Sequence, residues 1–256
     1  MSLTKPRFSP SETRTAVRVV TVARGRFNRR TRFRRSVALA IVPGLADVER
    51  VALACTLCPL SQGRTTVVFG EGDPHAQLMV VGEGPGRDED LQGRPFVGRS
   101  GQLLDKLLQE EAGLARRQVY IANVVKCRPP GNRDPLPAEI AACRPYLEQQ
   151  VELIAPKVVL TLGNFATRAL LGTNEAISRL RGRTYPFGPG AVLVPTFHPA
   201  AALRGGGEVV ARMRADIVRA RQALEQAQPG PQPALEAEPI RAPQTVLEPE
   251  PRLEVP

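Results

Sequence analysis

Four cysteines are the residues of this chain whose type and spacing most clearly suggest chemistry. Cys55 and Cys58 form a C-x2-C pair, Cys127 follows after a gap of 68 residues, and Cys143 follows after a further 15. They are the only cysteines among the 256 residues. One close pair and two distant single thiols suit a metal site that the fold assembles. Zinc and an iron–sulfur cluster both accept four thiolates, so the spacing leaves these two open.

Disulfide bonds and buried free thiols are the alternatives to a metal site. Disulfides need an oxidising compartment. The first 35 residues are basic and contain no sustained apolar stretch, so we expect no signal peptide. No run approaches the roughly 18–20 apolar residues of a membrane span. We therefore expect a cytoplasmic protein without membrane contact, which disfavours disulfides, whereas free core cysteines stay open because cysteine is often simply buried.

The net charge of +10 is concentrated at one end of the chain. Residues 1–40 carry eleven basic residues and one acid, so the remainder is balanced. We predict that residues 1–44 are a disordered basic extension. It is either a nucleic-acid-binding arm, a solvated extension, or upstream sequence translated from a wrong start codon. Residues 228–256 are rich in proline and glutamate and are predicted to be a disordered tail.

The segment 45–227 alternates short apolar runs with helical patterns, and we expect it to form a single domain. Strands are expected at 77–82, 118–123, 157–162 and 191–196, and helices at 101–111, from Pro137 onward, at 164–171 and at 209–226. This alternation predicts a three-layer α/β/α fold with a central, mainly parallel four-stranded sheet. Ligands bind beyond the carboxyl ends of such strands. The strand ends at 82–86, Asn123 and 197–199 should therefore meet in one pocket.

Several motifs in this segment resemble family 4 uracil-DNA glycosylases, the iron–sulfur branch of the uracil-DNA glycosylase superfamily. They are GEGPG at 82–86, Glu89-Asp90, GRPFVG at 93–98, NVVKCRPP at 123–130 and His198-Pro199. No single motif is decisive, but the ordered set is specific. The resemblance implies a monomer in the cytosol or nucleoid of a bacterium or archaeon. It also implies a [4Fe–4S] cluster on the four cysteines, which together with the fold would give a single iron–sulfur domain.

The resemblance implies hydrolysis of the N-glycosidic bond of deoxyuridine in single- or double-stranded DNA, which leaves an abasic site in base excision repair. Such an enzyme moves the base out of the stack into a pocket. Phe96 would stack on the uracil, and Asn123 would read its edge, because a carboxamide offers one donor and one acceptor. Gly84 would let the backbone approach the base, and Glu89 would exclude the methyl group of thymine. Local sequence alone also allows a core phenylalanine, a turn asparagine and a helix-capping glutamate.

Glu83 and His198 are the catalytic residues that the resemblance implies. The uracil leaves with negative charge, and a hydrogen bond from His198 to uracil O2 would stabilise that charge. Glu83 would orient or activate the attacking water, although a capping carboxylate is the plainer alternative. Leu203 would fill the gap left by the flipped base, and Arg204 would contact phosphate. Ala200 stands where the family commonly has serine, which puts one hydrogen bond in doubt.

Further basic residues in the motif loops are candidates for phosphate contacts. They are Arg87, Arg94, Arg99, Lys126, Arg128 and Arg133. The alternative function is a module that binds or crosslinks uracil-containing or abasic DNA without turnover. A superfamily relative that traps DNA covalently does so through a basic loop containing histidine. The stretch 128–133 here has no histidine, which favours the enzyme.

Overall fold

The computed structural model describes residues 44–227. The segments predicted to form a basic extension and a proline-rich tail lie outside the described residues, apart from their innermost positions. Within residues 44–227, no helix combines the length and the apolar content needed to cross a membrane. All the motifs named above lie within residues 44–227.

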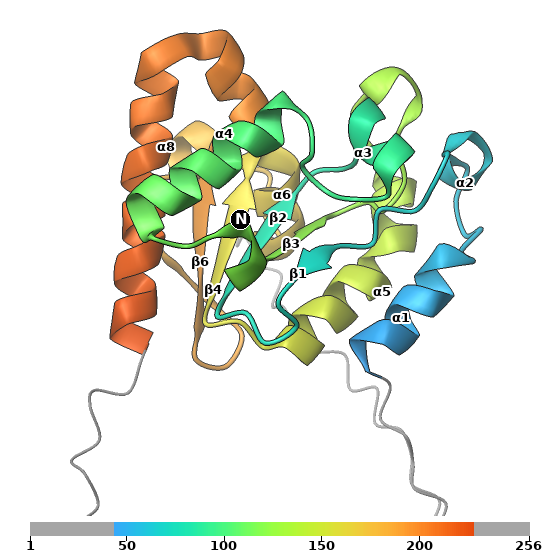
Figure 1. The fold of residues 1–256 in the computed structure, drawn as a ribbon, viewed down its shortest axis with the longest axis horizontal. Helices are drawn as coiled ribbons and strands as arrows, with labels where there is room; N and C mark the ends of the chain where they lie inside the picture. The colour runs from blue at the N-terminus through green and yellow to red at the C-terminus, as the bar shows by residue number, and fades with distance from the viewer. Residues whose placement is uncertain (1–43, 228–256) are drawn as a thin grey trace, which may run out of the picture.

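Six strands form one mixed, mostly parallel sheet in the order β1-β3-β2-β4-β6-β5 (Figure 1). The four predicted strands are its parallel centre: β2 (Leu78–Gly82), β3 (Tyr120–Asn123), β4 (Val158–Leu162) and β6 (Ala191–Thr196). The prediction of only four strands was wrong, because β1 (Glu71–Gly72) and β5 (Tyr185–Phe187) pair antiparallel with the two edges. Strands of two and three residues are too short to show an alternating pattern.

Helices cover both faces of the sheet (Figure 1). On one face, Met79 and Val81 of β2 pack in a core with helices α1 (Leu45–Leu53), α5 (Pro137–Ile154) and α6 (Gly163–Leu171). On the other face, Leu78 and Val80 pack with α4 (Arg99–Leu107) and α8 (Pro199–Ala227). Successive residues of β2 therefore enter opposite cores, as a strand buried on both faces requires.

Short helical segments in the connections between these elements complete the fold. They are α2 (Leu60–Gly63), α3 (Arg87–Gln92), the π-turn Leu108–Ala112, the 3-10 turns Arg116–Gln118 and Pro130–Asn132, and α7 (Ile177–Leu180). Helix α8 begins ten residues before the predicted helix, because Pro199 suits a first turn and three alanines favour helix. Gly206, with φ 70°, breaks it. Leu203 therefore lies in the first part of α8.

Candidate active site and cysteine pocket

The three distinctive strand ends lie around one open cavity of about 660 Å3. Gly82 and Asn123 are paired at the ends of β2 and β3, and His198 follows β6 by two residues. The cavity is lined by these predicted site residues: Glu83, Gly84, Glu89, Phe96, Asn123, His198 and Arg204. Leu203 does not line it, and its side chain is 44% exposed.

Asn123 and Phe96 form adjoining walls of the cavity. Asn123 is 1% exposed, and its Oδ1 atom has no hydrogen-bond partner among the described residues. A Cβ atom on Gly82 would lie 2.5 Å from Asn123 Oδ1 and 2.5 Å from Phe96 Cζ, so only glycine permits both side chains there. A buried acceptor without a partner is costly to the free protein. A donor group that enters the cavity can satisfy this acceptor.

His198 faces the same cavity, with its ring centroid 5.8 Å from that of Phe96. Burial, reinforced by the charge of Arg204, lowers the pKa of His198 to about 4. The neutral ring accepts a hydrogen bond from the Ala200 backbone N–H at Nδ1, at 3.2 Å. The ring proton therefore sits on Nε2, where it can be donated to a ligand.

Glu83 is a half-buried residue that directly follows β2, and it lines the cavity. Burial, together with repulsion from Asp134, raises its pKa to about 7. A carboxyl group with this pKa exchanges a proton readily near neutral pH, which suits a general base. A strongly shifted pKa inside a cavity is also typical of a functional site.

Glu89 joins two loops that border the cavity. Its Oε2 atom accepts a hydrogen bond from Gly86 N–H at 3.1 Å, and its Oε1 atom accepts from Val97 and Gly98 N–H, both at 3.0 Å. The capping arrangement considered from sequence is thus present, and exclusion of thymine stays a prediction. Asp90 lies elsewhere, buried and bound to the backbone N–H groups of Thr65 and Thr66.

The basic candidates for phosphate contacts separate into two groups. Arg87, Arg99 and Arg133 line the cavity. Arg94 lies outside that lining and pairs with Glu71 at 2.6 and 2.8 Å. Lys126 is 1% exposed, so its assignment as a phosphate contact was wrong. Arg128 donates to Asn132 Oδ1 at 2.7 Å.

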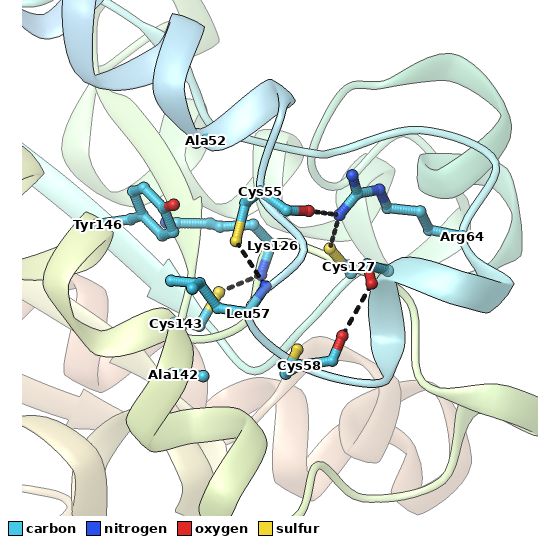
Figure 2. A pocket seen from close by; sticks show the side chains of 11 residues that line it. Ala52, Cys55, Leu57, Cys58, Arg64, Lys126, Cys127, Ala142, Cys143 and Tyr146 are labelled. Carbon is cyan, nitrogen blue, oxygen red and sulfur yellow. Dashed lines mark hydrogen bonds between the residues drawn. The ribbon is translucent and has the colours of Figure 1, made fainter.

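The four cysteines line a second, smaller pocket between α1, α2, α5 and the end of the β3 loop (Figure 2). All four are free thiols. Arg64 Nη1 donates to Cys127 Sγ at 3.3 Å, and the backbone N–H of Lys126 donates to Cys143 Sγ at 3.2 Å. Burial raises the pKa of both Cys127 and Cys143, the latter to about 11. Buried thiols of this kind are poor thiolates unless a cation accompanies them.

Four cysteines around one pocket are a donor set that a metal centre can use. Within residues 44–227, no group of three or more His, Cys, Asp or Glu side chains is placed to hold a single metal ion. A zinc ion needs four sulfurs converging at about 2.3 Å from one point. Four sulfurs distributed around a pocket suit a cluster in which each iron takes one cysteine.

Lys126 connects the two pockets. Its backbone N–H bonds Cys143, and its Nζ atom donates to the backbone oxygen of Asn123 at 2.8 Å and to Gln150 Oε1. Gln150 in turn donates to Phe69 O at 2.9 Å. The segment from Asn123 to Cys127 is therefore held by one internal network.

Sequence reasoning missed the internal role of Lys126, and also Gln150 and Arg116. Lys126 offered one usable signal, because it lies within a run of apolar residues and cysteine. Arg116 and Gln150 offered none, since each sits among other polar residues. Their contacts come from segments more than ten residues away.

The comparisons with known proteins agree on one superfamily. The sequence model of the uracil DNA glycosylase superfamily matches residues 69–225, which include every cavity residue named above. The chain is 47% identical over 166 residues to the type-4 uracil-DNA glycosylase of Sulfurisphaera tokodaii, covering 62% of this chain and 76% of that protein. The type-4 uracil-DNA glycosylase of Thermotoga maritima is 48% identical over 166 residues, covering 64% of this chain and 85% of that protein. A type-5 uracil-DNA glycosylase of Pyrobaculum aerophilum is 31% identical over 191 residues, with 66% and 83% covered.

Proposed function

Because the chain belongs to the uracil DNA glycosylase superfamily, we propose that its open cavity receives a deoxyuridine flipped out of DNA. The protein is a type-4 uracil-DNA glycosylase, a hydrolase of N-glycosyl bonds that acts in base excision repair. The roles proposed below for individual residues combine the resemblance of the motifs with the geometry of the cavity.

The unpartnered Oδ1 atom of Asn123 beside the ring of Phe96 is the observation that carries this proposal. Uracil N3–H would donate to Oδ1, and the amide NH2 group of Asn123 would donate to uracil O4. Cytosine has an unprotonated N3 and an amino group, so it offers the opposite pattern. Phe96 would stack on the base, which is worth ~1–3 kcal/mol.

His198 and Glu83 would act on the bond that breaks. As the C1′–N1 bond cleaves, its electron pair moves to the uracil, and charge builds on O2. The Nε2–H group of neutral His198 donates to O2 and stabilises the transition state more than the ground state. A water molecule attacks C1′, and the Glu83 carboxylate takes its proton. The carboxylate also favours the positive charge that develops on the sugar.

The remaining cavity residues would define the substrate. Gly84 would let the backbone approach the base, and no larger residue fits there, because an added Cβ would lie 2.7 Å from Val125 Cγ2. Glu89 would occupy the space beside uracil C5 and exclude the methyl group of thymine. Arg204 would contact a phosphate of single- or double-stranded DNA, and exposed Leu203 would enter the stack.

We further propose that the four cysteines hold a [4Fe–4S] cluster. Bound there, the cluster would supply iron–thiolate bonds that cross-link the end of α1, the loop after β3 and helix α5. The buried thiols of Cys127 and Cys143, with pKa values raised by burial, fit a site that needs bound metal to become thiolate. The chain itself would then hold Asn123 through Lys126.

Purified protein incubated with oligonucleotides containing one deoxyuridine tests the function. Wild type should leave alkali-labile abasic sites, and His198→Ala should slow this by about 10²–10³-fold. The matched control is His75→Ala, because His75 is the other histidine of the chain and lies exposed on a loop. No cleavage by wild type would contradict the function. A stable protein–DNA adduct would instead support a binding module.

Metal analysis of the same preparation tests the cofactor. Four iron and four sulfide per chain, with broad absorbance near about 400 nm, would support the cluster. A colourless protein with one zinc would contradict it.

A further inference from the structure

The backbone at Phe96 has an uncommon conformation. Its φ angle is 52°, in the left-handed region that bulky residues rarely adopt. Gly101 packs against it so closely that an added Cβ would lie 1.7 Å from Phe96 O. Such a conformation persists only where the surrounding structure holds it in place. The position of the Phe96 ring therefore depends on whatever holds its backbone.

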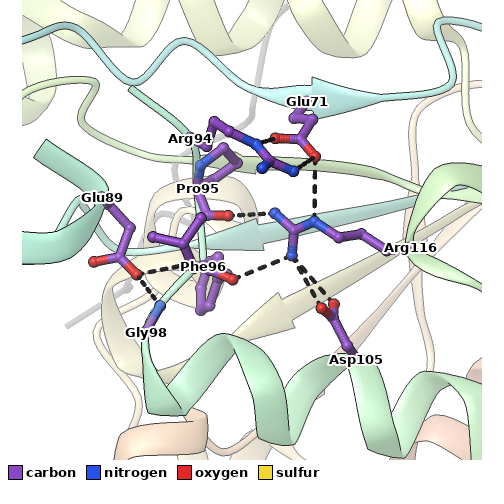
Figure 3. A network of polar contacts seen from close by, with 9 residues as sticks. Glu71, Glu89, Arg94, Pro95, Phe96, Gly98, Asp105 and Arg116 are labelled. Carbon is purple, nitrogen blue, oxygen red and sulfur yellow. Dashed lines mark hydrogen bonds and ion pairs between the residues drawn. The ribbon is translucent and has the colours of Figure 1, made fainter. Parts of the chain in front are cut away.

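Arg116 holds this backbone from behind the cavity (Figure 3). It lies twenty residues along the chain, in the 3-10 turn Arg116–Gln118. Its Nη1 atom donates to Phe96 O at 3.1 Å, and its Nη2 atom donates to Pro95 O. The side chain is 20% exposed and does not line the cavity. Arg116 therefore contacts the segment that carries the ring and not the space for the base.

Carboxylates fix the guanidinium of Arg116 in turn. Its Nε atom donates to Glu71 Oε1 at 3.2 Å, and its Nη1 atom also donates to Asp105 Oδ1 at 3.2 Å. Arg94 donates to both carboxylate oxygens of Glu71, so Oε1 accepts from both arginines. Each guanidinium nitrogen of Arg116 is thus engaged, which leaves it poorly suited to bind a phosphate of DNA.

Glu89 holds the same segment from the opposite side. Its Oε1 atom accepts the N–H groups of Val97 and Gly98, directly after the carbonyls of Pro95 and Phe96 that Arg116 binds. One backbone polar group on each of four consecutive residues is therefore fixed by two charged side chains that approach from opposite sides (Figure 3).

We propose that Arg116 is a positioning residue that sets the Phe96 ring in the stacking geometry for uracil. The inference rests on the proposed stacking role of Phe96. A guanidinium can reach two neighbouring carbonyls at once because its donors form a planar fork, whereas an ammonium group acts as a point charge. Arg116→Lys therefore keeps the charge beside Glu71 and Asp105 but loses the paired contact with the backbone.

The test uses the intact protein and two affinities. One is the inhibition constant of free uracil in the excision assay, which reports on the base cavity. The other is the affinity for DNA with a tetrahydrofuran abasic analogue, which has no base to stack. Arg116→Lys should weaken inhibition by uracil about fivefold and leave abasic-DNA affinity within about twofold. Arg94→Lys is the matched control for inhibition by uracil, because Arg94 binds the same Glu71, and it should leave that value within about twofold.

Two results would overturn the positioning role. One is that the inhibition constant of free uracil is the same for Arg116→Lys as for Arg94→Lys. The other is an equal fall in both affinities, which would indicate general structural damage. If Arg116→Lys does not fold, Asp105→Asn is the second variant, because Asp105 orients the Nη1 atom that binds Phe96 O. It should weaken uracil inhibition about threefold with abasic-DNA affinity kept, and an effect no larger than that of Arg94→Lys would overturn the proposal.

Phe96→Ala separates this proposal from the proposed function. It should weaken uracil inhibition by about 10- to 100-fold. If it leaves inhibition unchanged, the stacking role itself is wrong. If it weakens inhibition while Arg116→Lys does not, only the positioning role of Arg116 is wrong.

Discussion

The two walls of the base cavity are held in place by different means. The Asn123 wall is continuous with the cysteine pocket, through Lys126 and Cys127, and its contacts lie within one deeply buried network. The Phe96 wall is held by charged side chains that reach it from separate segments, Arg116 from one side and Glu89 from the other. The first wall should therefore depend on the proposed cluster, and the second on ion pairs and hydrogen bonds. Changes at one should leave the other intact.

Cys143→Ser should have the largest effect, because it removes one of the two buried ligands of the proposed cluster. Loss of a structural metal site belongs to the most destabilising class of substitution, on the order of 5 kcal/mol. In a domain of this size that corresponds to a fall in Tm of ~10–20 °C. Iron content, Tm and uracil excision should all fall together. A variant without iron that keeps the wild-type Tm and excision rate would contradict the dependence of the Asn123 wall on the cysteines.

Lowering the pH should have the next largest effect, and it should leave both walls intact. The pKa of Glu83 is raised to about 7, so its active carboxylate is lost as the pH falls through 7. Excision should decline about tenfold per unit below that value, roughly 100-fold by pH 5. His198, with a pKa lowered to about 4, stays neutral over this range. Inhibition by free uracil between pH 5 and 8 should change little, and a parallel loss of inhibition would contradict the assignment.

Through Glu83, the stability of the fold should change with pH in the opposite direction to the excision rate. Because the pKa of Glu83 is raised on folding, the folded state binds more protons than the unfolded state between about pH 4.5 and 7. Its contribution to stability therefore decreases as the pH rises through that window. Glu83→Gln should raise Tm above pH 7 relative to wild type, with little difference at pH 4, and it should abolish most excision. A lower Tm for the variant at pH 8 would contradict burial as the cause.

Lys126→Met should have an intermediate effect on the Asn123 wall. The substitution keeps the length of the side chain but removes the donor to Asn123 O and Gln150 Oε1. An unsatisfied buried acceptor costs about 1–3 kcal/mol, so excision should fall about tenfold as the wall loosens, with iron content unchanged. Lys157→Met is the matched control, because Lys157 is exposed next to β4. Equal excision rates in the two variants would show that Lys126 does not hold Asn123.

Glu71→Gln should have the smallest effect. Arg94, its exposed partner, has 56% of its side chain exposed, and such pairs contribute about 0–1 kcal/mol. The bonds from Arg116 to the carbonyls of Pro95 and Phe96 remain in this variant. Tm should fall by no more than about 4 °C, and the difference from wild type should shrink when salt is raised from about 0.05 to 0.5 M. A large fall that persists in high salt would mean that Glu71 contributes more than an ion pair.

The central strands and the location of the cavity could be predicted from sequence because their signals are local. Each central strand is a short apolar run, and the residues just beyond β2, β3 and β6 are distinctive. The edge strand Glu71–Gly72 could not be predicted, since its pairing with β3 is decided by tertiary contacts. The early start of α8 at Pro199 was missed because three glycines separate it from the periodic part of the helix.

The site shows the same division between local and long-range signals. Asn123, His198 and Phe96 belong to motifs that are continuous in the chain. The contacts of Arg116 and Gln150 join residues 11 to 81 positions apart, and their side chains give no periodic signal. Buried charges such as Lys126 are equally hard to predict, because burial of a lysine is a property of its partners and not of its neighbours in sequence.

Base discrimination in a single-turnover excision assay tests the central claim most directly: that Asn123 and Phe96 together form the uracil site. Wild type, Asn123→Ala and Phe96→Ala would each be given otherwise identical DNA carrying uracil, cytosine or thymine at one position. Wild type should release uracil and neither of the other two bases. Phe96→Ala should release uracil about 10- to 100-fold more slowly than wild type, and Asn123→Ala at least about 100-fold more slowly. Release of cytosine or thymine by wild type at a comparable rate, or full uracil excision by Asn123→Ala, would contradict the claim.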